Sequence, residues 1–233
     1  MLVVRDVVSG YGELEVLRGL SARFEEGVIT TVIGANGAGK STLLKTIFGM
    51  LQAKQGSIEF GGADITNWSS RKILQHGLAL VPQGRCNFPA MTVQDNLRVS
   101  LDSRRGDDKQ AHLDVVYGEF PVLFEKRRTL AGNLSGGEQQ ILEMAMVLLQ
   151  KPRLMLVDEP SLGLSPAMLD QVFAKILEVK QKGITVVMVE QNAKQALAIS
   201  DRGMVLEMGR QRMEGAARDL LDHAGIRQVY LGG

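Results

Sequence analysis

Short apolar runs of core-strand length alternate along this chain with segments whose apolar residues recur at helical spacing. Three continuous apolar runs, Leu78 to Val81, Leu154 to Val157 and Thr185 to Val189, predict strands buried on both faces. Ile29 to Ile33 is β-branched and is followed by a glycine, which predicts a fourth strand. This alternation is typical of an α/β protein with a largely parallel sheet.

Two segments between these runs have the pattern of helices. Lys40 to Phe48 places its leucine, isoleucine and phenylalanine side chains on one face. Pro166 to Lys182 has proline near its start and Gly183 past its end, the usual asymmetry of helix termini. Both helices fit the α/β alternation.

The first residues and the stretch Ser57 to Phe60 favour antiparallel strands, because turn glycines flank them. Residues from about Thr92 to Gln150 contain no convincing strand. Within them, Thr92-Val93-Gln94-Asp95 and Ser135-Gly136-Gly137-Glu138 have the form of capping boxes at helix starts. The chain therefore predicts a small antiparallel β layer and a helical insertion beside the α/β core.

These patterns predict one domain over residues 1–233. The β layer and a RecA-like core are expected at about 1–88 and 151–233, and a helical subdomain at about 89–150. The charged stretch Asp102 to Gln110 is predicted as a solvated loop.

Composition narrows the class of protein. The 233 residues are 45% apolar and 23% charged, which is ordinary for a globular chain. With 27 basic and 26 acidic side chains the net charge is +1, so charge gives no argument for a nucleic-acid partner. The single cysteine, Cys86, fits a reducing compartment, and no signal peptide is expected after Met1. The apolar runs are too short to cross a bilayer, so a partner would have to hold the chain at any membrane where it works.

A glycine-rich segment carries the strongest chemical signal. Gly34-Ala35-Asn36-Gly37-Ala38-Gly39-Lys40-Ser41 matches the phosphate-binding pattern G-x-x-x-x-G-K-S/T. Its glycines let backbone N–H groups curl around phosphate oxygens at a helix N-terminus. Lys40 is expected to reach the β- and γ-phosphates, the Ser41 hydroxyl to bind Mg²⁺, and Thr42 to complete the ATP-binding set. A fortuitous glycine-rich turn is the alternative, and the position between a predicted strand and a predicted helix argues against it.

Two carboxylates follow the predicted strand Leu154 to Val157. Side chains at the carboxyl end of such a strand face the crevice where ligands bind in α/β sheets. We expect Asp158 to hold Mg²⁺ through water and Glu159 to polarise the attacking water. Alone, the pair could equally be a solvated strand end.

The segment Leu134-Ser135-Gly136-Gly137-Glu138-Gln139-Gln140 offers a hydroxyl, two glycine amides and a helix N-terminus, all suited to an anion. Capping alone would also explain Ser135 and Glu138. Together, the phosphate loop, LSGGEQQ and LMLVDEP resemble the ATP-binding subunit of ABC transporters over essentially the whole chain. In that family two cassettes dimerise head to tail. The resemblance implies that Ser135, Gly136 and Gly137 contact the ATP bound by a partner cassette.

The resemblance also implies roles for three further residues. Tyr11 matches the aromatic residue that stacks on adenine, and Val16 the small apolar residue that flanks the ring. A buried tyrosine of the β layer is the alternative for Tyr11. Gln83 matches the glutamine that touches Mg²⁺ or the attacking water and links the site to the membrane partner.

This chain departs from the family pattern at two positions. Gln191 stands where members usually carry a histidine, and glutamine cannot gain a charge as histidine can. Leu164, in Ser161-Leu162-Gly163-Leu164, replaces the aspartate of S-A-L-D. With Glu159, Gln83 and Lys40, Gln191 is still counted among the catalytic residues. The departures indicate that this chain's own hydrolytic site is the weaker one.

The segments DEPSLGLSP, VEQNAKQAL and VPQGRCNFPAMTVQDNL resemble the shorter of the two ATPases in importers of branched-chain amino acids. Importers of urea and short amides use very similar subunits. The resemblance implies a sibling or identical partner ATPase and transmembrane permease subunits at the cytoplasmic face of the membrane. It also implies, indirectly, a periplasmic or extracellular solute-binding protein.

Two other functions stay open on the sequence. One is a soluble ATPase of the same type that works on DNA or the ribosome, although this chain lacks a coiled-coil insertion and a second cassette. The other is a regulatory subunit with weak activity, which Gln191 and Leu164 would suit.

Overall fold

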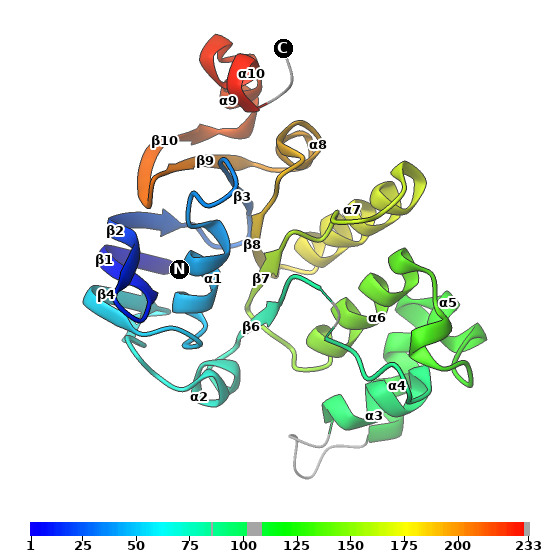
Figure 1. Ribbon diagram of the computed structural model, residues 1–233. Coiled ribbons are helices and arrows are strands. Elements are labelled where there is room, and N and C mark those ends of the chain that lie inside the picture. The colour runs from blue at the N-terminus through cyan, green and yellow to red at the C-terminus, as the bar shows by residue number, and fades with distance from the viewer. Residues whose placement is uncertain (85, 102–108, 231–233) are drawn as a thin grey trace.

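The computed structural model describes residues 1–84, 86–101 and 109–230. Its central sheet has the strand order β10-β9-β3-β8-β7-β6. All of these strands run parallel except β10, which pairs antiparallel with β9 (Figure 1). Their bounds are β3 Ile29–Ile33, β6 Leu78–Val81, β7 Leu154–Asp158, β8 Thr185–Val189, β9 Arg202–Glu207 and β10 Arg210–Ala216. The four core strands expected from the sequence are confirmed, with β7 one residue longer than predicted.

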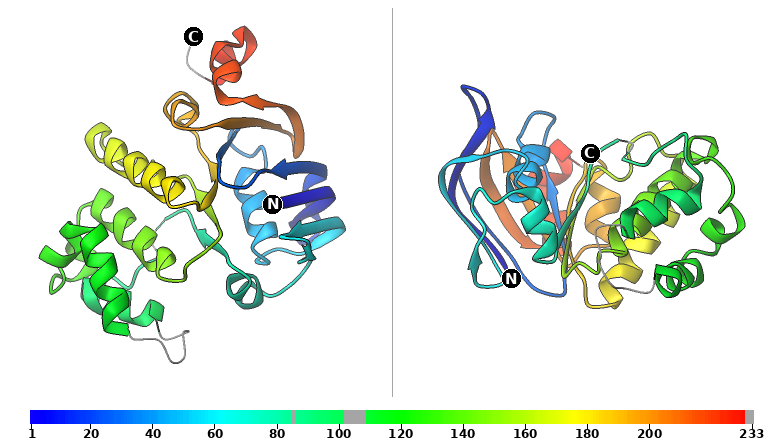
Figure 2. Two further views of the ribbon diagram at one scale, coloured as in Figure 1. Left: turned by 180° about the vertical axis from the view of Figure 1, so that it is seen from behind. Right: turned by 90° about the horizontal axis from the view of Figure 1, so that it is seen from below.

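An antiparallel sheet of order β2-β1-β4-β5 forms a second layer, as predicted. Its strands are β1 Leu2–Tyr11, β2 Leu14–Phe24, β4 Ala53–Phe60 and β5 Ala63–Asp64. Helix α1, Lys40–Ile47, lies between the two sheets (Figure 2). Its Leu43, Leu44 and Ile47 join side chains from both sheets in one buried core.

Side chains of the central strands alternate between the two faces of the sheet. Leu154 and Leu156 of β7 pack in the core around α1, whereas Met155 and Val157 pack in the core of the opposite face. That opposite face is covered by α6 Gly136–Leu148, α7 Pro166–Gln181 and α8 Ala193–Ala198. The remaining short helices are α2 Ser70–Gln75, α9 Ala217–Asp222 and α10 Ala224–Tyr230. The last two pack beside β9.

The helical segment between β6 and β7 has a core of its own. It contains α3 Val93–Leu101, α4 Lys109–Glu119, α5 Pro121–Glu125, the 3-10 helix η1 Ala131–Asn133 and α6. Helix α6 belongs to two cores, because Leu142 packs with α3 to α5 and Met144 packs against the central sheet. In Figure 1 this segment and α1 lie on opposite sides of the central sheet.

Most helix predictions agree with the structure to within a residue, and the remaining differences have local causes. Within the described part of the predicted loop Asp102 to Gln110, Lys109 and Gln110 begin α4, and residues 102–108 lie outside the described residues. Strand β9 went unpredicted because Gly203 weakens its β pattern. A Cβ at Gly203 would lie 2.4 Å from Leu220 and 2.6 Å from Leu197, so close helix packing requires glycine there.

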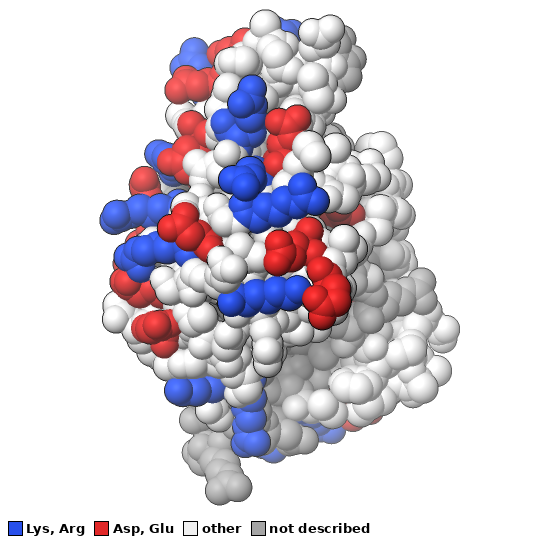
Figure 3. Space-filling view, turned by 60° about the vertical axis from the view of Figure 1, so that its left-hand side comes forward, with Lys and Arg blue, Asp and Glu red and all other residues white. Residues whose placement is uncertain are grey.

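The face of the antiparallel sheet carries basic and acidic side chains side by side (Figure 3). Arg5 pairs with Glu59 at 3.0 Å on this sheet, and Arg212 of β10 pairs with Glu207 of β9 at 3.6 Å on the central sheet. Exposed pairs of this kind contribute little to stability, so this face acts mainly as a solvated surface. None of the helices within the described ranges combines the length and the hydrophobicity that crossing a bilayer requires.

Candidate functional site

The carboxyl ends of four neighbouring parallel strands lie side by side at one end of the central sheet. The order β3-β8-β7-β6 brings together the phosphate loop after β3, Gln191 after β8, Asp158 and Glu159 at the end of β7, and Gln83 after β6. Carboxyl ends of parallel strands are where ligands bind in open α/β sheets. The structure therefore gathers the residues predicted from four separate segments.

The phosphate loop joins β3 to α1 through glycines with left-handed backbone angles. Gly37 has φ of 80° and Gly39 has φ of 106°, conformations that side chains disfavour. A Cβ at Gly34 would lie 2.3 Å from the Leu206 carbonyl oxygen, whereas nothing lies within 4 Å of the Cβ position at Gly37. The backbone at Gly37 is thus open to a ligand, and the loop fits the phosphate chain of a nucleotide.

Lys40 is directed into this loop. Its side chain is 4% exposed, and its ammonium group donates hydrogen bonds to the Gly34 carbonyl at 2.9 Å and the Ala35 carbonyl at 3.3 Å. The same nitrogen lies 3.9 Å from Oε1 of Glu159. A cation held inside a glycine-rich loop at a helix N-terminus is suited to phosphate oxygens.

Asp158 lies on the α1 side of β7, like Leu154 and Leu156, because strand side chains alternate. Its Oδ1 accepts a hydrogen bond from the Ser41 hydroxyl at 2.8 Å. Burial raises the pKa of Asp158, while the Ser41 hydrogen bond and the charges of Lys45 and Lys40 act in the opposite direction. Hydroxyl and carboxylate oxygens at this spacing are a donor set that Mg²⁺ prefers.

Glu159 turns away from the line of β7. Its backbone has φ of 47°, a left-handed conformation that costs roughly 1–3 kcal/mol for a residue other than glycine. Its N–H donates to the Val189 carbonyl at 3.0 Å, and its Oε2 accepts from Nε2 of Gln83 at 2.7 Å. The carboxylate is thus held between Gln83 and Lys40.

The Ser135 segment lies elsewhere. Ser135 is the N-cap of α6, in the predicted capping box with Glu138. The Cβ positions of Gly136 and Gly137 face Leu164 and Met168, at 3.2 and 3.0 Å. Because α6 and α1 cover opposite faces of the central sheet, this segment and the phosphate loop of the same chain are not brought together.

Val16 lies beside the phosphate loop, 3.3 Å from the Cβ position of Gly39, and Tyr11 pairs with Leu14 where β1 meets β2. Tyr11, at the end of β1, is 47% exposed, so the alternative of a buried tyrosine is wrong. Val16 lines a pocket of about 260 Å³ together with Leu14, Gly37 and Met208. The apolar side chains beside the loop, with an exposed ring at the end of the neighbouring strand, are suited to a flat base.

The two residues that depart from the family pattern, Gln191 and Leu164, have different surroundings. Gln191 is exposed at the end of β8, and its backbone N–H donates to the Glu190 carboxylate at 3.0 Å. Leu164 packs against the apolar core beneath α7. Leucine at this position thus contributes to packing where an aspartate would offer charge.

Sequence reasoning missed two buried glutamates. Glu190 is 0% exposed and Glu143 is 1% exposed, and burial raises the pKa of both. Oε1 of Glu143, on α6, accepts from the backbone N–H groups of Cys86 at 2.8 Å and Asn87 at 3.4 Å, and from Nδ2 of Asn87 at 2.8 Å. A glutamate inside an apolar helix face, or directly after a buried strand, is the signal that could have identified them.

Comparisons with known proteins agree with this geometry. A family profile described as ABC transporter matches residues 17–162. The high-affinity branched-chain amino acid transport ATP-binding protein BraG of Pseudomonas aeruginosa is 44% identical over 233 residues, 100% of both chains. The probable branched-chain amino acid transport ATP-binding protein LivF of Archaeoglobus fulgidus is 36% identical, covering 96% of this chain and 95% of the relative. A solved ADP conformation of an ATP-binding cassette of an ABC transporter superposes with a TM-score of 0.87 at 28% identity, covering 100% of this chain and 99% of that one.

Proposed function

The chain belongs to the ABC transporter family of ATPases, and from this premise we propose that it is the ATP-hydrolysing subunit of an importer for branched-chain amino acids. The observation that carries the solute class is the 44% identity to a branched-chain amino acid transport ATP-binding protein over the full length of both chains. The match spans all 233 residues and therefore covers the strand ends where the site residues gather.

In this proposal the residues at the strand ends hydrolyse ATP. The amides of residues 34–39 and the Lys40 ammonium bind the β- and γ-phosphates, and the exposed ring of Tyr11 stacks on adenine beside Val16. Glu159 accepts a proton as a water oxygen bonds to the γ-phosphorus, and the bond to the bridging oxygen of ADP breaks. Gln83, which donates a hydrogen bond to Glu159 at 2.7 Å, orients that carboxylate and the water.

Ser41, Asp158 and Gln83 would hold Mg²⁺, Asp158 through a water molecule. Bound there, the ion would neutralise negative charge on the β- and γ-phosphates. The 2.8 Å hydrogen bond from the Ser41 hydroxyl to Asp158 supports this assignment, because it brings two oxygen ligands together at the start of α1.

The site needs a partner in this proposal. Ser135, Gly136 and Gly137 lie on the far side of the central sheet from α1, so they would contact the ATP of a second cassette, either a copy of this chain or a sibling ATPase. Closure of the pair around ATP and reopening after hydrolysis would drive the cycle.

We propose that the helical subdomain, residues 89–150, and the segment after Gln83 receive the permease. A groove of about 310 Å³ lies between this subdomain and the core, and Cys86, Val99 and Met146 line it. Phe88 stands exposed at 47% in the same segment. An apolar groove of this kind suits a short helix of the permease, which would hold the chain peripherally at the cytoplasmic face of the membrane. A solute-binding protein would act on the permease from outside.

The hydrolytic assignment is tested by Glu159→Gln in the full chain. We expect turnover to fall roughly 10²- to 10⁴-fold, the usual contribution of a general base, while ATP still binds. ATPase assays and equilibrium binding of a fluorescent ATP analogue measure the two effects. Glu178→Gln, on the exposed part of α7, is the matched control. A Glu159→Gln chain that hydrolyses ATP at the wild-type rate would contradict the assignment.

The solute class is tested by uptake in cells. Deletion of the gene is expected to abolish uptake of labelled leucine, isoleucine and valine, and the wild-type gene but not Glu159→Gln should restore it. Loss of labelled urea uptake with branched-chain uptake intact would instead identify an importer of urea or short amides. Unchanged uptake of both would favour an ATPase outside transport.

A further inference from the structure

Four hydrogen-bond donors converge on the buried carboxylate of Glu190. Its Oε1 accepts from the Ser161 N–H at 2.8 Å. Its Oε2 accepts from the Ser161 hydroxyl at 2.7 Å and from the N–H groups of Gln191 at 3.0 Å and Asn192 at 3.2 Å. One side chain thereby joins the segment after β7 to the segment after β8.

A carboxylate is the group that these donors require. Both of its oxygens accept, so each side of Glu190 can face backbone N–H groups. A glutamine at this position would turn an NH₂ group toward the Ser161 N–H or toward those of Gln191 and Asn192. A buried donor placed against another donor costs roughly 1–3 kcal/mol. Here the opposed donors would be backbone N–H groups of the segments after β7 and after β8, so those two segments would have to move.

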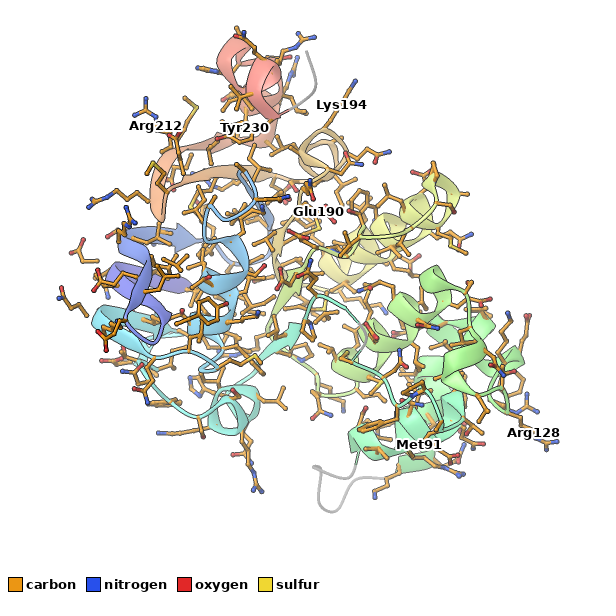
Figure 4. All side chains as sticks on the ribbon, viewed as in Figure 1. Met91, Arg128, Glu190, Lys194, Arg212 and Tyr230 are labelled. Atoms are coloured by element: carbon orange, nitrogen blue, oxygen red, sulfur yellow. The ribbon has the colours of Figure 1, made fainter. Side chains whose placement is uncertain are left out.

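The backbone of Glu190 is fixed at the centre of the site. Its N–H donates to the Val32 carbonyl at 3.2 Å, on the strand that leads into the phosphate loop. The preceding residue, Val189, accepts the Glu159 N–H at 3.0 Å. Figure 4 shows Glu190 at the strand ends in the middle of the molecule, below Lys194 of α8 and far from Arg128 of the helical segment.

We propose that Glu190 is a positioning residue for hydrolysis, because it fixes the backbone that aims Glu159. Residues 159 to 161 are tied at both ends to residues 189 and 190, so the left-handed turn at Glu159 is held on either side. The same carboxylate holds the N–H of Gln191. This inference rests on the role proposed above for Glu159.

The test is Glu190→Gln in the full chain, assembled with its partner ATPase. We expect kcat to fall about ten- to a hundredfold, the loss that a displacement of about 1 Å in a catalytic group can produce. The dissociation constant for ATP should stay within about threefold of wild type, because the phosphate loop keeps its own hydrogen bonds. Ser161→Ala, which removes one donor and leaves the backbone N–H, should give a smaller fall in kcat.

Asp201→Asn is the matched control for the loss of a structural carboxylate. Asp201 accepts from the Ile29 N–H at 2.8 Å and from Lys180 at 2.6 Å, beside the start of β3 at the opposite edge of the sheet. We expect this variant to lower the melting temperature and leave kcat per folded molecule unchanged. A kcat loss in Asp201→Asn that matches that of Glu190→Gln would overturn the proposal, as would a Glu190→Gln chain with wild-type kcat.

A double variant separates this inference from the proposed function. If Glu190 acts through Glu159, adding Glu190→Gln to Glu159→Gln should lower the single-turnover rate by less than twofold, since coupled effects are not additive. Multiplied losses would show that Glu190 acts independently and would overturn the inference. Full activity of Glu159→Gln alone would instead remove the premise, and the two failures are thereby distinguishable.

Discussion

Gln191 occupies a position of particular interest among single residues. It stands at the end of β8, exposed, on a backbone held by Glu190. A glutamine there can donate a hydrogen bond to a phosphate oxygen at any pH, whereas an imidazole gains a positive charge as the pH falls. The wild-type chain is therefore expected to lack an ionisation that a histidine would bring.

Gln191→His should introduce that ionisation. Because the ordinary histidine pKa is about 6.5, the ratio of variant to wild-type turnover should rise as the pH falls from about 8 to about 6. ATPase assays over that range measure the ratio, with Asn192→His as the neighbouring control. A ratio that does not change with pH would indicate that residue 191 does not reach the phosphate.

The sequence predicted which residues carry the chemistry of the site. The contacts among those residues depend on the order of the strands in the sheet, which the sequence did not show. Lys40, Ser41, Asp158 and Glu159 were identified because they occur in motifs at fixed spacing. Glu190 was not, because its donors come from residue 161 as well as from its own loop, and no local pattern encodes that meeting. The left-handed backbone at Glu159 is likewise invisible in the sequence, since glutamate carries no preference for it.

Helix α6 has three separate roles along its length. Ser135 and Glu138 cap its N-terminus, Leu142 packs in the helical core, and Met144 packs against the central sheet. Between these last two, Glu143 holds the backbone of Cys86 and Asn87. The helix therefore connects the Ser135 segment to the chain that follows Gln83.

Glu143 gives the chain a pH-dependent stability term. Burial raises its pKa in the folded chain above the ordinary value of 4.5, so the folded chain keeps a proton that the unfolded chain loses. The stability that this bound proton gives the folded chain is fully present below pH 4.5. It is lost as the pH rises through the pKa of Glu143 in the folded chain. Glutamine does not ionise, so the free energy of unfolding of the Glu143→Gln chain should fall less than that of wild type as the pH rises above 4.5. Urea denaturation of both chains at several pH values measures the difference. Parallel curves for the two chains would contradict this.

Elements with long periodic patterns were predicted well, and short ones were not. Helix α7 agreed with its prediction because proline and glycine mark its two ends. The short helices α8, α9 and α10 are held by packing around Ile33, Val205 and Leu220, which are distant in sequence. Tertiary contacts of this kind decide short elements and leave no local signature.

At the scale of the whole molecule, the groups proposed to bind nucleotide lie on two sides. The phosphate loop, Asp158 and Glu159 share one edge of the sheet, and the Ser135 segment lies against α7 on the other face. Two chains facing one another would bring these surfaces together. Dimerisation in the presence of ATP is therefore the property expected to depend on Ser135.

Ser135→Asp tests this without removing the helix cap. Serine and aspartate cap helices about equally well, so the unfolding free energy should stay within about 0.5 kcal/mol. The added negative charge should repel the phosphates of the partner's ATP and abolish ATP-dependent association in a Glu159→Gln background. Sedimentation velocity with a second copy or with the sibling ATPase measures it. Ser69→Asp, at the N-cap of α2, is the matched control, and equal association of both variants would refute the assignment.

Strands β6 and β7 are adjacent in the sheet, although the whole helical segment separates them along the chain. The entropy of closing such a loop grows only with the logarithm of its length, about 0.6 kcal/mol for each doubling. Because the segment has its own core, residues can be gained or lost within it while the pairing of Val81 with Val157 stays in register. Evolution can thus vary the segment proposed to meet a permease almost independently of the strand ends proposed to hydrolyse ATP. One catalytic frame can in this way serve transporters of many solutes.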